Sequence, residues 1–190
     1  MRAIVVNEFG PVNAHRVEEC PDPAPDAGEV LIENHAIGLN FPDMLMLRGK
    51  YQKRPARPFV PGRDCAGIVR AIGPGVTRCK VGDRVVAQVF TGAFGELVPA
   101  PQKRCFVLPD AVSFEDAAAM ITVFNTAWVA MDIRAQVQAG ETVMVTGAAG
   151  GVGSAAVQLC KARGTIVIAA VSSAERGEMA REYGADFVVI

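Results

Sequence analysis

The chain has 190 residues, of which 51% are hydrophobic and 21% charged, so it can bury a core and lacks the polar, charge-rich signature of disorder. Its 19 Lys and Arg residues nearly balance 20 Asp and Glu residues, giving a net charge of -1. This balance offers no overall field for a polyanion, and we expect neither nucleic acid nor a membrane as a partner.

The cysteines and the N-terminus bear on the compartment. The 5 cysteines include no Cys-x-x-Cys pair, and the first residues contain no apolar run long enough for a signal peptide. These features predict reduced thiols in a cytoplasmic protein, with the mitochondrial matrix as the alternative. The most apolar stretch, residues 117–131, is too short to span a bilayer, and we predict a buried helix there.

Short apolar runs separated by Pro and Gly fill the first 110 residues, as in "CAGIVRAIG" (65–73). This texture predicts a β-rich unit, either a barrel or a sandwich. One helix is expected in "FPDMLMLRG" (41–49), because Pro42 suits a first helical turn. Another is expected after Ser113, where Asp116 completes a capping-box pattern.

Strand and helix alternate in the last third of the chain. The expected elements are a strand at 142–146, a helix at 150–163, a strand at 165–171, a helix at 174–183 and a strand at 187–190. This βαβαβ order predicts a parallel three-stranded sheet with right-handed crossovers. The predicted class is α/β with a β-rich domain, and we place the boundary near residue 123, giving domains 1–123 and 124–190.

A glycine-rich turn joins the first of these strands to its helix. Such a turn lets backbone N–H groups at the helix N-terminus face a phosphate, and its position in a βαβ unit favours a dinucleotide over a turn needed only for helix–sheet packing. A mononucleotide P-loop is disfavoured because Ser154 stands where that motif requires Lys. We expect the pyrophosphate to bind at Ala148, Ala149, Gly150, Gly151, Val152 and Gly153.

The second strand of the unit indicates which dinucleotide binds. An NAD site normally carries an acidic residue about 20 residues after the glycines, to bind the ribose 2′-hydroxyl. No Asp or Glu lies between residues 154 and 174; instead Ser172, Ser173 and Arg176 follow the strand. Hydroxyls and a guanidinium suit a 2′-phosphate, so NADPH is the predicted cofactor. A helix N-cap for the serines and a plain surface role for Arg176 stay open.

Several ordered blocks together resemble the medium-chain dehydrogenase/reductase superfamily, in its zinc-free, zeta-crystallin-like quinone oxidoreductase branch. The resemblance implies a GroES-like β-barrel followed by a partial Rossmann domain, with the active site in the cleft between them. Family members continue further, which implies a C-terminally truncated chain and leaves open a homo-oligomer formed through the exposed sheet edge. The blocks are "GLNFPDMLMLRGKY" (38–51), "PFVPGRDCAGIVRAIGPGV" (58–76), "GAFGELVPAP" (92–101) and "GAAGGVGSAAVQL" (147–159).

The residues also argue against a catalytic zinc ion, which needs three protein ligands. By the resemblance, Asn40 stands where zinc-dependent members carry Cys, and Arg63 where they carry His. No Cys or His occurs at residues 106–159, where a third ligand would be sought. We therefore expect a metal-free site.

The resemblance implies hydride transfer from NADPH to a quinone or a similar conjugated carbonyl, such as an enone. Asn40 and Tyr51 would be the catalytic residues: Asn40 would bind the nicotinamide ribose or a bound water, and Tyr51 would line the quinone pocket. Thr126 would lie beside the nicotinamide. The residues themselves leave open a turn role for Asn40 and a half-buried anchor role for Tyr51.

Two other functions stay open. One is an NADPH-binding or structural protein with little turnover, and the other is an enoyl-thioester reductase. Among the remaining residues, we expect Asp43 to cap or pair locally. Cys65, beside Asp64, is the one candidate for a reactive thiol, and a buried, inert thiol is the favoured alternative. A basic run of Lys50, Lys53, Arg54 and Arg57 is either a solvated loop or an aid in gathering a phosphorylated cofactor.

Overall fold

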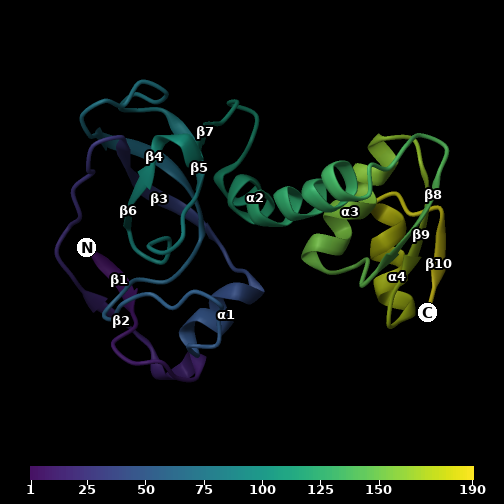
Figure 1. The fold of residues 1–190 in the computed structure, drawn as a ribbon, viewed down its shortest axis with the longest axis horizontal. Coiled ribbons are helices and arrows are strands. Elements are labelled where there is room, and N and C mark those ends of the chain that lie inside the picture. The colour runs from purple at the N-terminus through teal and green to yellow at the C-terminus, as the bar shows by residue number, and fades with distance from the viewer. The chain divides into compact units, whose positions relative to one another are not determined.

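A computed structural model describes the whole chain, from Met1 to Ile190 (Figure 1). It comprises two units, Met1–Ile121 and Thr122–Ile190, and the division between them falls within one helix. None of the helices has both the length and the apolar character needed to cross a membrane. The functional domain boundary near residue 123 stays a prediction.

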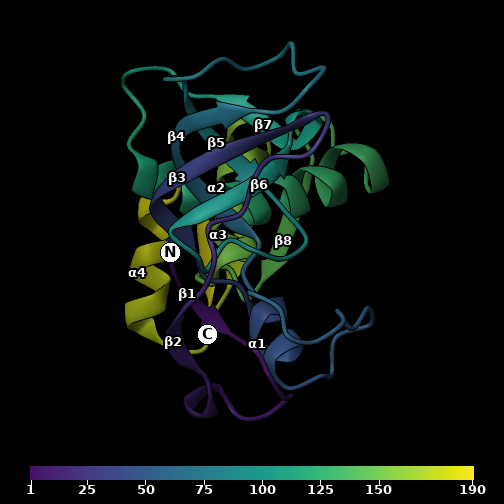
Figure 2. The same cartoon turned by 90° about the vertical axis from the view of Figure 1, so that its left-hand side faces the viewer.

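The first unit is built on an antiparallel sheet with the strand order β6–β3–β4–β5–β7, visible in Figures 1 and 2. A separate hairpin pairs β1 (Arg2–Val5) with β2 (Arg16–Glu19), and the short 3-10 turn η1 (Val12–Ala14) precedes β2. The sheet strands are β3 (Glu29–Gly38), β4 (Asp64–Ile72), β5 (Arg84–Gln88), β6 (Leu97–Pro101) and β7 (Cys105–Val107), with the 3-10 turn η2 (Gln102–Arg104) before β7.

The larger of two buried clusters in this unit lies on one face of the sheet, and a smaller cluster joins Ala66 and Val86 to Ala117, Ala118 and Ile121. Alternate residues of β3, such as Val30 and Ile32, are fully buried, as period-two alternation requires. They pack with Val69, Val85 and Val98 from the neighbouring strands. The expectation of a β-rich unit from the short apolar runs is thus confirmed.

The helix α1 (Phe41–Leu47) follows β3 and confirms the expected helix in this segment. It lies beside the N-terminal segment, since the N–H of Gly10 donates to the carbonyl of Leu47 at 2.9 Å. Figure 2 shows α1 at the same end of the unit as the β1–β2 hairpin.

The long helix α2 (Phe114–Trp128) begins where the capping pattern predicts, because the Oγ of Ser113 accepts from the N–H of Asp116 at 3.0 Å. The prediction of a buried helix at 117–131 is wrong in its burial. Only one stripe is buried, including Ala117 and Ile121, whereas Trp128 is 50% exposed. The helix then widens into a π-helical turn, η3 (Val129–Arg134). A run of apolar residues therefore overstated burial, because a helix turns some of them toward solvent.

The second unit is the predicted βαβαβ arrangement. Its strands are parallel in the order β10–β9–β8, and the elements are β8 (Thr142–Thr146), α3 (Gly151–Ala162), β9 (Ile166–Ala170), α4 (Ala174–Glu182) and β10 (Phe187–Val189). Both helices pack on the sheet face that carries Val145, Val167 and Ala169 (Figure 1). The opposite face leaves Met144 57% and Phe187 59% exposed.

The strands β3 and β4 approach closely at Gly67, and a substitution there tests this contact. A Cβ atom added there would lie 1.9 Å from the carbonyl oxygen of Glu33. We expect Gly67→Ala to lower the free energy of unfolding by about 2 kcal/mol or more, because the backbones of the two strands must separate. Chemical denaturation measures this loss. The control is Gly10→Ala, whose added Cβ would make an ordinary contact of 3.6 Å with Ala14; an equal loss in both variants would contradict the explanation.

Candidate functional site

The glycine turn of the second unit depends on two close backbone features. Gly147 has a φ of 62°, which favours glycine, and a Cβ added at Gly153 would lie 2.2 Å from the carbonyl oxygen of Gly147. The turn closes as the N–H of Gly150 donates to the carbonyl of Gly147 at 2.9 Å. The helix α3 then starts with N–H groups that have no acceptor within the helix, which is the geometry that binds anions.

Two hollows flank this turn, and Gly147 lines both. The first, of about 370 Å³, contains Ala149, Ser172 and Arg176 together with the ends of β9 and β10. The second, of about 450 Å³, contains Gly150, Gly151, Val152 and Gly153 beside the end of β8. Of the predicted pyrophosphate residues, Ala149 therefore lines the first hollow and residues 150–153 line the second, whereas Ala148 is fully buried in the core.

The three residues predicted to select the 2′-phosphate have different positions. Ser172 and Arg176 both line the first hollow. Ser173 is the N-cap of α4, and its Oγ accepts from the N–H of Arg176 at 3.3 Å. The capping alternative therefore describes Ser173, whereas Ser172 and Arg176 are brought together at the hollow.

Thr126 lies on α2 and lines neither hollow. Its hydroxyl donates to the carbonyl of Thr122, one turn earlier, at 2.7 Å. This bond within the helix uses the hydroxyl proton and leaves its oxygen as an acceptor. The role of Thr126 beside a nicotinamide stays a prediction.

In the first unit, Asn40 begins α1 and is tied to two carboxylates. Its side-chain nitrogen Nδ2 donates to the Oδ2 of Asp64 at 2.9 Å, and its backbone N–H donates to the Oδ2 of Asp43 at 2.8 Å. Asp43 therefore caps locally, as expected. Both carboxylates are almost completely buried, with Asp43 3% and Asp64 1% exposed.

Asp43 is also electrostatically unusual. Burial is the largest cause that raises the pKa of its carboxyl group, to about 6, and the nearby Asp64 raises it further while the Asn40 N–H and Arg63 lower it. Its second oxygen, Oδ1, is buried without a hydrogen-bond partner. An unpartnered carboxylate oxygen in this position can accept a hydrogen bond from a ligand.

Tyr51 is hydrogen-bonded to Arg63, which the sequence analysis considered only as a replacement for a zinc ligand. The Nη1 of Arg63 donates to the Oη of Tyr51 at 2.8 Å, and the Nε of Arg63 is buried without a partner. Gly62 directs the turn before Arg63, because it has a φ of 92° and a Cβ there would lie 2.2 Å from the ring of Phe94. The sequence signal that could have indicated a site role for Arg63 is that it stands where the resemblance implies a histidine.

An apolar hollow of about 480 Å³ adjoins Asn40 and Asp43. Sequence reasoning did not find it, because its walls come from three separate segments: the N-terminal segment with β1 and η1, the segment that begins α1, and Phe94. It also contains His15, whose Nε2 is buried without a partner. Its apolar wall consists of Ile4, Val12, Leu39, Phe41, Met44, Leu47 and Phe94.

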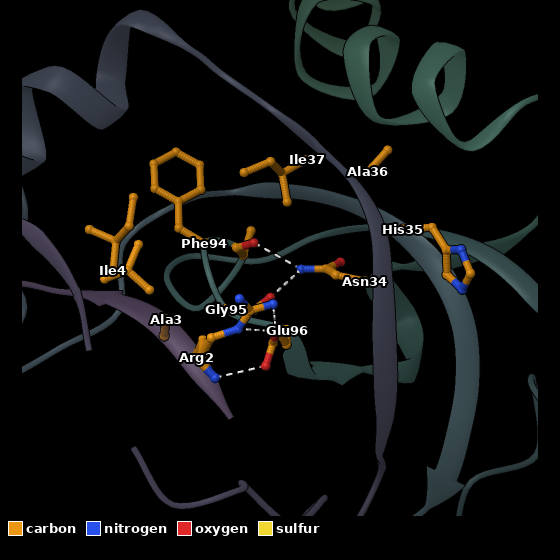
Figure 3. A pocket seen from close by; sticks show the side chains of 12 residues that line it. Arg2, Ala3, Ile4, Asn34, His35, Ala36, Ile37, Phe94, Gly95 and Glu96 are labelled. Carbon is orange, nitrogen blue, oxygen red and sulfur yellow. Dashed lines mark hydrogen bonds and ion pairs between the residues drawn. The ribbon is translucent and has the colours of Figure 1, made fainter. Parts of the chain in front are cut away.

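A further hollow, of about 350 Å³, lies between β1 and β3 (Figure 3). Its polar groups join neighbouring segments: the Nδ2 of Asn34 donates to the carbonyl of Gly95 at 2.7 Å, and Arg2 pairs with Glu96 at 2.6 Å. Figure 3 shows His35 on the other side of β3, where its ring lies 4.8 Å from that of Phe114. None of the predicted site residues lines this hollow.

The cysteines and potential metal ligands are dispersed. Cys65 is fully buried, which confirms the expectation of a buried thiol, and this burial is the main cause that raises the pKa of the thiol. Its lack of reactivity stays a prediction. No three or more His, Cys, Asp or Glu side chains gather in a way that could hold a metal ion. Independence from metal stays a prediction.

Family models match both units. The model described as "Alcohol dehydrogenase GroES-like domain" matches residues 26–110, and the model described as "Zinc-binding dehydrogenase" matches residues 151–190. The second segment contains one cysteine and no histidine, so it lacks the Cys and His ligands that structural zinc sites use.

Individual relatives indicate the branch of the family to which the chain is similar. The human synaptic vesicle membrane protein VAT-1 homolog is 37% identical over 97% of this chain, and rat quinone oxidoreductase is 36% identical over 97%. The Escherichia coli quinone oxidoreductase, solved in complex with NADPH, aligns over 100% of the chain with 33% identity and a TM-score of 0.93.

The chain belongs to the medium-chain dehydrogenase/reductase superfamily. It falls in the branch that contains the quinone oxidoreductases and the VAT-1 proteins. The expected GroES-like β domain, followed by a parallel Rossmann-like βαβαβ unit, is thereby confirmed. The chain spans 47% of the human VAT-1 homolog, 57% of the rat enzyme and 58% of the bacterial one.

The buried carboxyl of Asp43 predicts an unusual pH dependence. Because its pKa in the folded state lies above the ordinary value of 3.8, ionisation destabilises the fold, and stability falls as the pH rises from about 4 to about 6. Asp43→Asn removes this loss, which amounts to about 3 kcal/mol at pH 7 for a shift of about 2 units. Denaturation at pH 7 and pH 5 should show that the advantage of the variant falls by about half at pH 5.

The control for this measurement is Glu96→Gln. The backbone N–H and the guanidinium of Arg2 donate to the Glu96 carboxylate and lower its pKa, so the wild type should lose that stabilisation as the pH falls. The two variants must therefore change in opposite directions relative to the wild type. An Asp43→Asn effect that is the same at both pH values would show that the carboxyl is not perturbed.

Proposed function

We propose that this chain is the NADPH-binding and acceptor-binding part of a zinc-independent oxidoreductase that transfers hydride to a quinone or a similar conjugated carbonyl. The observation that carries the proposal is the pair of hollows that meet at Gly147, one with Ser172 and Arg176 and the other with the start of α3. A dinucleotide needs this arrangement, since its two halves extend from one pyrophosphate.

The residues present fit NADPH by their chemistry. The first turn of α3 offers N–H groups for the pyrophosphate. A Cβ added at Gly147 would meet no heavy atom within 4 Å, so the space beside this residue is open. The guanidinium of Arg176 and the hydroxyl of Ser172 suit a 2′-phosphate, and no acidic side chain lines their hollow. Relatives support the assignment, because the Escherichia coli quinone oxidoreductase was solved in complex with NADPH.

The acceptor side of the proposal rests on the first unit. Bound NADPH would supply two electrons as a hydride. Tyr51 accepts a hydrogen bond from Arg63, so its own hydroxyl proton stays available for donation to an acceptor oxygen. Asn40, held by Asp64, would orient the nicotinamide ribose or a water molecule. The apolar hollow beside Asn40 lies within the size range of small-molecule sites and suits a flat, apolar ring.

The test separates NADPH binding from turnover, because the chain spans 47% of the human VAT-1 homolog and 57% of rat quinone oxidoreductase. NADPH is titrated into the chain, and loss of nicotinamide absorbance is then followed with 9,10-phenanthrenequinone and, separately, with a crotonyl thioester. We expect binding and quinone-dependent oxidation. Binding without turnover would favour an NADPH-binding or structural role, turnover of the thioester alone would favour an enoyl-thioester reductase, and absence of NADPH binding would overturn the proposal.

A single substitution tests the proposed preference for NADPH over NADH. Arg176→Ala should weaken NADPH binding about 10-fold to 100-fold and leave NADH nearly unchanged, because a charge-assisted bond to the 2′-phosphate is lost. The control is Arg181→Ala on the same helix, where the guanidinium pairs with Glu178 at 2.9 Å. Equal losses for both dinucleotides in Arg176→Ala would show that Arg176 does not recognise the phosphate.

A further inference from the structure

One charged feature of the first unit has no part in cofactor binding as proposed. The segment from Met44 to Arg63 contains 6 of the chain's 19 Lys and Arg residues and no Asp or Glu, in a protein whose net charge is -1. We call residues 48–57 the basic loop. It contains Arg48, Lys50, Lys53, Arg54 and Arg57, all exposed.

The cations of the basic loop are not neutralised by acidic partners. No ion pair involves any of them, and Arg48, Lys50 and Arg54 have no side-chain partner. The two others rest on aromatic rings: Lys53 lies 4.8 Å from the ring centroid of Phe90, and Arg57 lies 4.8 Å from that of Phe9. Such contacts hold a cation in place without cancelling its charge.

The hydrogen bond between Arg63 and Tyr51 joins this loop to the candidate site. Tyr51 belongs to the basic loop, so the 2.8 Å bond places the guanidinium of Arg63 against it. The carboxylates near Arg63, Asp43 and Asp64, are buried, whereas the loop cations face solvent. The field that an approaching ligand meets at Tyr51 is therefore positive.

We propose that the acceptor of this protein carries an anionic group, such as a carboxylate, sulfonate or phosphate, which the basic loop binds while its conjugated ring contacts Tyr51. This inference rests on the proposed function and specifies its substrate class. A nucleic acid is a poorer occupant, because the positive charge is confined to one loop of an otherwise balanced chain. The buried, unpartnered Nε of Arg63 provides a further donor on this side of the site.

A matched pair of ligands tests the proposal on the chain itself. Anthraquinone-2-sulfonate and 2-(hydroxymethyl)anthraquinone share one ring system and differ in charge. We expect the sulfonate to bind about tenfold more tightly at low ionic strength, as two or three exposed ion pairs provide, and the preference to shrink in high salt. Equilibrium dialysis measures both affinities without requiring turnover.

The sequence offers a matched pair of variants. Lys50→Gln with Arg54→Gln removes one Lys and one Arg from the basic loop, and Lys103→Gln with Arg104→Gln removes the same two charges from η2, on a different loop of the unit. The first variant should lose most of the preference for the sulfonate, and the second should keep it. NADPH affinity should be the same in both.

The outcomes separate this inference from the proposed function. Equal affinity for both anthraquinones would overturn the anionic acceptor but leave the reductase proposal intact. An equal loss in the two double variants would mean unspecific charge attraction, and a loss of NADPH affinity confined to the loop variant would mean that the cations serve the cofactor; either result overturns the inference. If neither anthraquinone binds, the quinone site itself is wrong.

Discussion

The second unit depends on the approach of two backbone segments within one turn. The first residue of the turn, Gly147, adopts a left-handed conformation, and its carbonyl occupies the space that a side chain at Gly153 would need. This contact sets the angle at which α3 leaves β8, and that angle decides where the unbonded N–H groups point. The hollows on both sides of the turn follow from it, because any larger residue would push helix and strand apart.

The candidate site in the first unit is organised by a different principle, a short chain of polar contacts behind an apolar wall. Asn40 joins two buried carboxylates. Arg63 donates a hydrogen bond to Tyr51 and interacts electrostatically with one of these carboxylates, Asp43. The resemblance to zinc-dependent family members implies that zinc ligands would stand at the positions of Asn40 and Arg63, which here carry an amide and a guanidinium. Both groups can donate hydrogen bonds, so they are suited to orient oxygen atoms of a ligand.

Local signals allowed much of this to be predicted from the sequence. The βαβαβ order, the parallel pairing and the glycine turn all follow from periodicity and from spacing along a short segment. The contact between Arg63 and Tyr51 could not be predicted, because it joins residues 12 apart through a turn whose direction is set by the packing of Gly62 on Phe94. The apolar hollow was equally hidden, since three separate segments build its wall. The burial of 117–131 was overestimated because composition does not reveal which helix face meets a partner.

The sheet that carries the glycine turn is covered by helices on one face only. Parallel strands are normally covered on both faces, yet Met144, Phe187 and Val189 are largely exposed opposite the helices. The strand β8 also has a neighbour on one edge only. Because β8 leads directly into the glycine turn, whatever covers that face or edge also restrains the turn. Phosphate binding and the stability of the sheet should therefore be coupled, since a ligand that binds the folded turn stabilises the strand that positions it.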